Sequence, residues 1–291
     1  DKNGYLSFTD HPEIFGDKVL NPYITTDFSE SQVEVITPAL DKIEETYSFL
    51  KALYDIVAFE IGDEILWPQS MPCFIPEDDE IPVAKYSEEG REAEEYRNKL
   101  LKKYGGKKQL ISGIHYNYSF NEEIIRKLYE SSDKELTYKE YKNSIYLKVA
   151  RNYLRYRWII VYLLGAAPVI HESFLNGCSC KLKQISEDGY TLDGAVSHRN
   201  GECGYRNKEE LYPNYDTVED YVESINKYVN DGVIDSHKDL YSQVRLKAKE
   251  PKNFLNSLLE DGISYLEYRS IDINPFEKGG ISLNDLYSFN Y

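Results

Sequence analysis

The sequence predicts one α+β domain in which helices cover the outer face of a mostly antiparallel sheet. Three stretches alternate polar and apolar residues with the period of two of a β-strand, at 31–37, 109–120 and 263–274. Other stretches repeat apolar residues at helical spacing, and no linker or internal repeat divides the 291 residues. We therefore expect a single domain over residues 1–291.

The stretch 109–120 (QLISGIHYNYSF) has two chemically different faces. Its apolar face carries Leu110, Ile114, Tyr116, Tyr118 and Phe120. Its other face carries Gln109, Ile111, Gly113, His115, Asn117 and Ser119, where the glycine leaves the backbone open to close approach. Taken alone, such a pattern is also typical of an antiparallel strand with one solvated face.

The other two stretches make a site more plausible than a solvated face. Glu34 lies on one face of 31–37, and Glu267 and Arg269 share an otherwise apolar face of 263–274. Charged groups on such a face are costly to bury unless they are paired or used. We expect the three strands to form one sheet whose concave side is a site.

Helices are expected between these strands. Thr37-Pro38 would open the first, Gly105-Gly106 would end a charged second, and Asn121 would cap a short third. The longest helical pattern, 138–164, is expected to be a central buried helix. Further helices are predicted at 216–230 and 251–260, a short strand at 241–247, and a long irregular loop at 177–212.

Composition restricts the partners. The net charge of -16 argues against nucleic acid and against an anionic membrane surface. The apolar run 158–170 is too short to span a bilayer, which needs about 20 residues. Cys73, Cys178, Cys180 and Cys203 are expected to be free thiols in a reducing cytoplasm. A metal cluster of the last three with His198 is the alternative, but its spacing fits no standard zinc pattern.

If Asp27, Glu34, His115 and Glu267 converge, they would suit Mg²⁺ or Mn²⁺, which prefer oxygen ligands and, for Mn²⁺, tolerate imidazole. Arginines near them would bind phosphate or carboxylate with bidentate geometry. The candidates are Arg199, Arg245 and Arg269. Acids, metals and arginines together indicate phosphoryl transfer. The same acids could instead be solvated, and the chain has neither a Walker motif nor GxGxxG.

Five segments give the sequence a specific resemblance. They are ITTDFSESQVEVITP (24–38), WPQSMPC (67–73), ISGIHYNYSF (111–120), YLLGAAPVI (162–170) and YLEYRSIDINPF (265–276). In this order they resemble bacterial glutamate–cysteine ligase, also called γ-glutamylcysteine synthetase. The resemblance implies a glutamine-synthetase-like fold, a curved antiparallel sheet with ATP and metals on its concave face.

The resemblance also implies a reaction. L-Glutamate would be phosphorylated by ATP at its γ-carboxylate, and the amine of L-cysteine would then displace phosphate to give γ-glutamylcysteine, the first step of glutathione biosynthesis. The chain would be either a separate ligase or the front part of a bifunctional protein with a fused glutathione synthetase domain. Small-molecule substrates, Mg²⁺ or Mn²⁺, and a cytoplasmic location are expected.

Site roles follow from the resemblance position by position. Glu34, His115 and Glu267 match metal ligands, with Asp27 at a matching acidic position. Gln109 matches a residue near the nucleotide, and Arg269 matches one near the phosphates. The catalytic candidates are Arg269 and Glu267. The nucleotide-binding candidates are Gln109, Arg245 and Arg269. The residues that match the cysteine pocket are Phe28, Tyr96, Leu100, Ile111, Arg199, Tyr205 and Tyr241.

The sequence departs from the family pattern in two respects. The paired glutamates that the family carries upstream are absent, as is the C-terminal part of the ligase domain, so residues 1–291 are expected to be inactive by themselves. The basic run expected after Tyr241 is reduced to Arg245 and Lys247. Two alternatives therefore stay open: a ligase that joins glutamate to another amine, and a non-catalytic module that binds nucleotide or amino acid.

Overall fold

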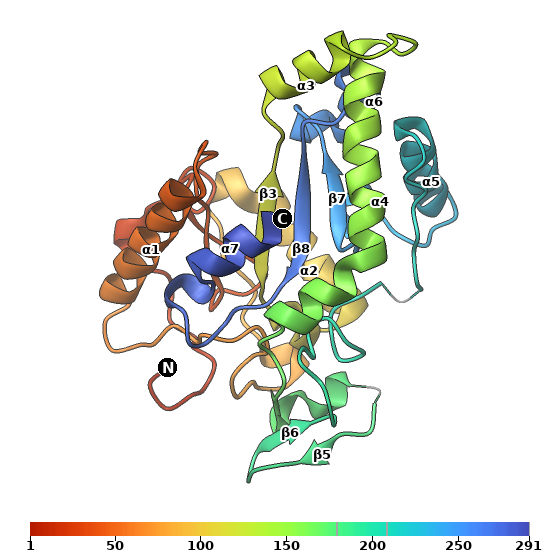
Figure 1. The fold of residues 1–291 in the computed structure, drawn as a ribbon. Helices are drawn as coiled ribbons and strands as arrows, with labels where there is room; N and C mark the ends of the chain where they lie inside the picture. The colour runs from red at the N-terminus through yellow and green to blue at the C-terminus, as the bar shows by residue number, and fades with distance from the viewer. Residues whose placement is uncertain (179, 208, 291) are drawn as a thin grey trace. The chain divides into compact units, whose positions relative to one another are not determined.

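A computed structural model gives the structure of residues 1–178, 180–207 and 209–290 (Figure 1). The chain forms two compact units. Unit 1 comprises Asp1–Gly113, Tyr162–Tyr205 and Asp272–Tyr291, and unit 2 comprises Ile114–Val161 and Arg206–Ile271. That one catalytic domain spans 1–291 stays a prediction, and Tyr291 lies outside the described residues.

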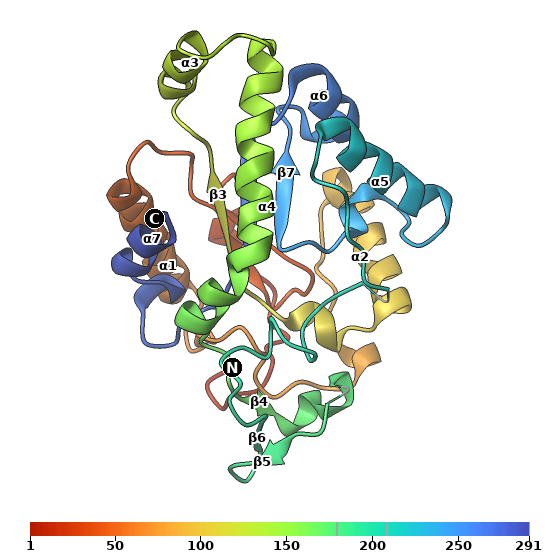
Figure 2. The same ribbon diagram turned by 45° about the vertical axis from the view of Figure 1, so that its right-hand side comes forward.

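Unit 2 is built on an antiparallel sheet with the strand order β3-β8-β7. The strands are β3 (Ile114–Tyr118), β7 (Val244–Lys247) and β8 (Tyr265–Ile271). The helices of this unit are α3 (Glu122–Glu130), α5 (Val218–Asn230), α6 (Phe254–Asp261) and most of α4 (Tyr138–Leu164). The long helix α4 has the predicted bounds, and in both ribbon views it runs along the sheet (Figures 1 and 2).

The apolar face of this sheet packs against α4. The Tyr153 ring lies 4.6 Å from that of Tyr268 on β8. Tyr146 is 1% exposed, and its hydroxyl accepts a hydrogen bond from the Phe120 amide (3.0 Å) and donates one to the Ser264 carbonyl (3.2 Å). Aromatic packing of this kind fixes which face of each strand is buried. The prediction of a buried α4 is confirmed only for its first half, because Trp158 is 64% exposed.

Unit 1 contains two smaller antiparallel sheets. Strands β1 (Ile24–Thr26) and β2 (Val33–Val35) form a hairpin, and β4 (Ile170–His171), β6 (Gly189–Thr191) and β5 (Lys183–Gln184) form the second sheet. The helices of this unit are α1 (Ile43–Glu60), α2 (Arg91–Tyr104) and α7 (Leu283–Asn290).

Two predictions about the strands are wrong. The 31–37 stretch pairs with β1 and not with the sheet that contains β3 and β8, so the three stretches do not form one sheet. The stretch 109–120 is strand only from Ile114, because Lys107–Leu110 form a 3-10 turn that carries Gln109. Alternation alone does not show where a strand begins.

The predicted helix ends at Asn121 and Gly105 are confirmed, because each residue caps a helix. The Asn121 side chain accepts hydrogen bonds from the amides of Glu123 (2.9 Å) and Ile124 (3.3 Å), as a helix N-cap should. Gly105 ends α2 with φ 79°, a conformation that favours glycine. The first helix, however, begins at Ile43 and not at Thr37-Pro38.

The prediction of four free thiols is wrong for two of them. Cys178 and Cys203 form a disulfide although they are 25 positions apart in the sequence, because the two segments bring their Cα atoms within 4.4 Å. The Cys180 sulfur lies 3.4 Å from that of Cys203, and Cys73 is a buried free cysteine. The spacing of cysteines in a sequence does not show which distant segments come into contact, so this disulfide was not predictable from it.

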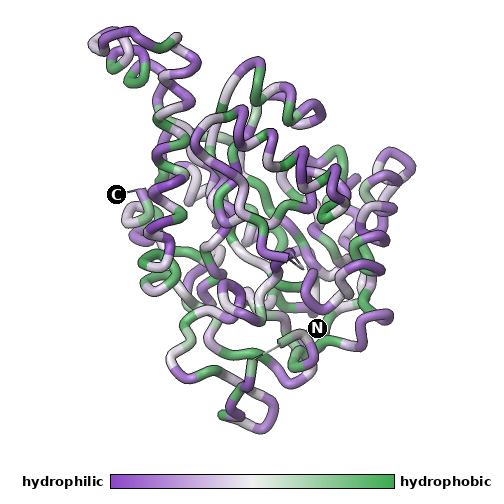
Figure 3. The backbone as a smooth tube through the Cα atoms, turned by 90° about the vertical axis from the view of Figure 1, so that its right-hand side faces the viewer, coloured by the Kyte–Doolittle hydropathy of each residue, from purple (hydrophilic) through white to green (hydrophobic). Residues whose placement is uncertain are grey.

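In the part of the chain that the structure describes, no helix is long and apolar enough to cross a membrane. Figure 3 shows hydrophobic and hydrophilic segments alternating over short stretches of the backbone.

Candidate functional site

The polar face of the β3-β8-β7 sheet gathers the charged side chains of strands β7 and β8. In the strand register, Asn117 of β3 and Arg245 of β7 lie directly opposite Glu267 of β8. Residues two positions apart on a strand share a face, so Arg269 and Lys247 belong to this same face. His115 lies where the β3 pairing shifts register between Ile114 and Tyr116. We call this surface the polar sheet face.

Glu267 is the centre of the polar sheet face. It is 7% exposed, and each carboxylate oxygen has its own cation: Oε1 lies 3.2 Å from Lys247 Nζ and Oε2 lies 3.1 Å from Arg269 Nη1. Burial alone would raise the pKa of Glu267, but the charges of Arg269, Lys247, Arg245 and His115 outweigh it and lower the pKa to about 2. The carboxylate is therefore ionised throughout the physiological range.

The cations around Glu267 are themselves oriented. The Arg245 guanidinium donates to the backbone carbonyls of Lys238 (3.1 Å) and Leu240. The Arg269 guanidinium lies over the Tyr241 ring, 6.0 Å from its centroid. The structure thus brings Tyr241, expected in the cysteine pocket, together with the catalytic candidate Arg269. Lys247 was not among the predicted site residues, although its place two residues after Arg245 on a predicted strand was a usable signal.

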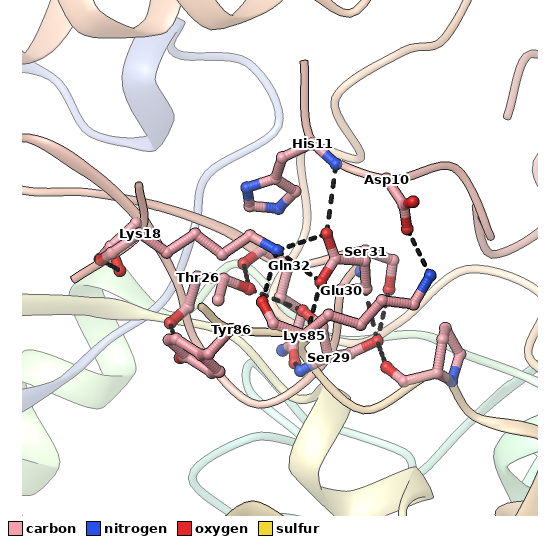
Figure 4. A network of polar contacts seen from close by, with 12 residues as sticks. Asp10, His11, Lys18, Thr26, Ser29, Glu30, Ser31, Gln32, Lys85 and Tyr86 are labelled. Carbon is pink, nitrogen blue, oxygen red and sulfur yellow. Dashed lines mark hydrogen bonds and ion pairs between the residues drawn. The ribbon is translucent and has the colours of Figure 1, made fainter. Parts of the chain in front are cut away.

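The second group of predicted residues lies in the β1–β2 hairpin of unit 1, where Asp27 and Glu34 are exposed and Phe28 is buried. A buried ion pair anchors this hairpin (Figure 4). Glu30 is 1% exposed and accepts hydrogen bonds from Lys18 Nζ (2.5 and 2.6 Å), the His11 amide (3.2 Å) and the Lys85 amide (2.8 Å). A buried carboxylate with this many donors fixes the hairpin backbone.

The Gln32 amide joins the hairpin to the segment that carries Gln109. Its Nε2 donates to the Gln109 carbonyl (3.1 Å) and to Ser112 Oγ (3.1 Å), and its Oε1 accepts from the Ser29 amide (3.0 Å). The Gln109 Nε2 is buried and makes no hydrogen bond to any residue that the structure describes. A buried donor of this kind is available to an acceptor atom of a ligand. Neither Gln32 nor the Glu30–Lys18 pair was predicted as part of a site.

Three predicted pocket residues of unit 1 share one hydrophobic cluster: Phe28 is in its buried part, and Leu100 and Ile111 pack against it. Tyr205 contacts Tyr104, with ring centroids 6.2 Å apart, and Tyr96 lies half-buried on α2.

Arg199 is 6% exposed, and its Nη1 lies 3.7 Å from Oδ1 of the buried Asp272. Burial raises the pKa of Asp272, although the charge of Arg199 and hydrogen bonds oppose the shift.

The metal candidates are divided between the units, with Asp27 and Glu34 in unit 1 and His115 and Glu267 in unit 2. Among residues 1–178, 180–207 and 209–290, no three His, Cys, Asp or Glu side chains are grouped so that they could hold a metal ion. This also leaves the cysteine–histidine cluster without support. Glu267 has the ionised oxygens that a hard cation needs, but a complete ligand set does not fit the described residues.

Comparison with known proteins gives a consistent result. The family model "Glutamate-cysteine ligase" matches residues 1–291. The glutathione biosynthesis bifunctional protein of Clostridium perfringens is 45% identical over 98% of the chain, and that of Desulfotalea psychrophila is 44% identical over 97%. The chain spans only 37% and 35% of these two relatives.

The chain is also similar to solved crystal structures. The bifunctional glutathione synthetase of Pasteurella multocida gives a TM-score of 0.85 at 36% identity, covering 99% of this chain and 36% of that one. The glutamate–cysteine ligase of Francisella tularensis, in complex with AMP, gives 0.87 at 28% identity, covering 99% and 62%.

Proposed function

Because the chain belongs to the glutamate–cysteine ligase family, we propose that it catalyses the ATP-dependent joining of L-glutamate to L-cysteine. An oxygen of the glutamate γ-carboxylate attacks the γ-phosphorus of ATP, ADP leaves, and a γ-glutamyl phosphate forms. The cysteine amine then attacks the acyl carbon and loses a proton, and phosphate leaves. The product is γ-glutamylcysteine, the first intermediate of glutathione biosynthesis.

The observation that carries this proposal is the polar sheet face. Phosphoryl transfer spreads negative charge over the oxygens of the transferred group, and fixed cations stabilise that charge. Arg269 and Lys247 are such cations, each held by one oxygen of the ionised Glu267. In this proposal Arg269 contacts the phosphates, Arg245 supports the nucleotide, and Gln109 donates a hydrogen bond to the nucleotide from its buried amide nitrogen. A metal, when bound, would neutralise phosphate charge, and Glu267 and His115 of unit 2 are its proposed ligands. The metal roles of Asp27 and Glu34 in unit 1 stay predictions from the resemblance.

We propose that the acceptor amino acid contacts Phe28, Tyr96, Leu100, Ile111, Arg199 and Tyr205 of unit 1, and the role of Tyr241 of unit 2 in binding the same amino acid stays a prediction from the resemblance. The sheet would have the curvature of glutamine-synthetase-like ligases. The protein would work in the cytoplasm on small-molecule substrates, and a synthetase part would be fused to it, as the names of its bifunctional relatives indicate for those proteins.

The test is ADP release by the full-length protein with glutamate, with and without cysteine, and identification of γ-glutamylcysteine by mass spectrometry. Arg269→Met should lower kcat by about 10²-fold, the order seen when one charge-stabilising donor is lost. The matched control is Arg155→Met, because Arg155 is an exposed arginine of α4 in the same unit. Equal activity of the two variants would remove Arg269 from the reaction, and release of ADP that does not depend on cysteine would point to another acceptor.

A further inference from the structure

Gly113 has no room for a side chain, because the Arg199 guanidinium occupies that space. A Cβ atom on Gly113 would lie 2.2 Å from Arg199 Cζ and Nη2 and 2.3 Å from Nε. These distances are far below van der Waals contact, and all three atoms belong to the guanidinium plane. From the sequence, Gly113 is expected to leave the backbone open to close approach. In the structure, the group that approaches the backbone there is the Arg199 guanidinium.

Asp272 lies at another part of the same guanidinium. Its side chain is 0% exposed, and its Oδ1 lies 3.7 Å from Arg199 Nη1. Both carboxylate oxygens are held: Oδ2 accepts from the Ala166 amide (3.0 Å) and Oδ1 accepts from Asn200 Nδ2 (3.2 Å). A carboxylate fixed in this way provides a rigid counter-charge for the arginine.

The backbone of Arg199 is fixed by other contacts. The neighbouring His198 amide donates to the Ala167 carbonyl (2.7 Å), and the Cys178–Cys203 disulfide ties down the same turn. Gly204 packs so closely on this turn that a Cβ there would lie 1.8 Å from the Arg199 carbonyl oxygen. Gly113 and Asp272 consequently act on the Arg199 side chain and not on its backbone.

We infer that Gly113 and Asp272 are positioning residues, which set the orientation of the Arg199 guanidinium and thereby the affinity of the site for the α-carboxylate of the acceptor amino acid. The inference rests on the proposed function, in which Arg199 belongs to the acceptor pocket. Bidentate binding of a carboxylate by arginine depends on the guanidinium plane, so a small rotation weakens it. Gly113 leaves space for the guanidinium plane of Arg199, and Asp272 provides the counter-charge that holds the guanidinium in place.

The test measures kcat and the KM values for cysteine, glutamate and ATP in the full-length protein. Gly113→Ala and Asp272→Asn should each raise the KM for cysteine about tenfold or more, the effect of disturbing one charge-assisted hydrogen bond. The KM values for glutamate and ATP, and kcat, should change by less than about threefold, because neither residue is proposed to contact glutamate or ATP. Asp193→Asn is the control, because Asp193 is an 86% exposed acid of the same unit.

A double-mutant cycle separates positioning from a general packing defect. Lysine has no guanidinium to meet a Cβ at position 113, so adding Gly113→Ala to Arg199→Lys should change the KM for cysteine by less than about twofold further. The same loss in both backgrounds, or an equal rise of KM for all three substrates, would overturn the inference. A wild-type protein with normal cysteine dependence and variants with unchanged KM would overturn it while leaving the proposed function standing. A wild-type protein that forms no cysteine-dependent product would overturn both.

Discussion

Glu267 owes its charge state to the basic side chains around it, and this changes what its substitution should do. If only acidic side chains surrounded Glu267, its replacement by glutamine would remove electrostatic repulsion. Here Lys247 and Arg269 each lie within 3.2 Å of one carboxylate oxygen, so the amide would leave two cations without their counter-charge.

Glu267→Gln should therefore destabilise the metal-free protein at neutral pH, in addition to abolishing turnover. The pKa of Glu267 is lowered from 4.5 to about 2, so its contribution is fully present above pH 4.5 and is lost as the pH falls through 2. A shift of this size corresponds to roughly 3 kcal/mol. Denaturant unfolding in EDTA should show this difference at pH 7 and a shrinking one toward pH 2.

Two further variants serve as controls for the Glu267→Gln unfolding experiment. Glu223→Gln removes an exposed acid of the same unit and should be nearly neutral. Lys247→Gln added to Glu267→Gln should recover part of the loss, because it removes one of the unpaired cations. A difference between wild type and Glu267→Gln that does not depend on pH would argue against an electrostatic origin.

Sequence patterns located the strands well where one face is apolar and aromatic. The alternation of β3 and β8 is confirmed because Tyr116 and Tyr268 pair across the sheet and Tyr268 packs on α4. Partner choice was not predictable, since hydrogen bonds between strands are the same for any sequence. The hairpin that carries Glu34 therefore belongs to a different sheet than expected. Gln109 lies on a 3-10 turn because tertiary packing sets where β3 begins.

The Cys178–Cys203 disulfide fixes the turn that carries Arg199 and Tyr205. Closing a loop with a sequence separation of 25 restricts the unfolded chain and should stabilise the protein by about 3 kcal/mol. Cys203→Ser should lower the Tm under oxidising conditions. In excess dithiothreitol the wild type should unfold at nearly the Tm of the variant.

Cys73→Ser is the matched control for the disulfide, because Cys73 is a buried cysteine without a disulfide partner. Its Tm should respond to dithiothreitol as the wild type does. A Tm of the wild type that is insensitive to the reductant would mean that the disulfide does not stabilise this turn.

The resemblance identified by sequence covers the whole chain, and the family model confirms it over residues 1–291. The individual site roles remain predictions, because only some of the residues meet within one unit. Glu267, Arg269, Arg245 and Tyr241 do so on the polar sheet face. The partners Glu30 and Asp272 became visible only in three dimensions, since each neutralises a charge that is distant in sequence.

Specific metal binding can be tested on the whole protein. The net charge of -16 means that any added cation screens repulsion between acidic groups, so a rise in Tm with Mg²⁺ alone proves little. MgCl₂ and NaCl must be compared at equal ionic strength. A specific site adds a stabilisation of about 1.4 kcal/mol when free Mg²⁺ is tenfold above its Kd. We expect the excess effect of Mg²⁺ in the wild type and in Glu223→Gln, and its loss in Glu267→Gln. Identical effects of the two salts on the wild type would rule out the metal role proposed for Glu267 and His115. That outcome would agree with the lack of a three-ligand group among the described residues.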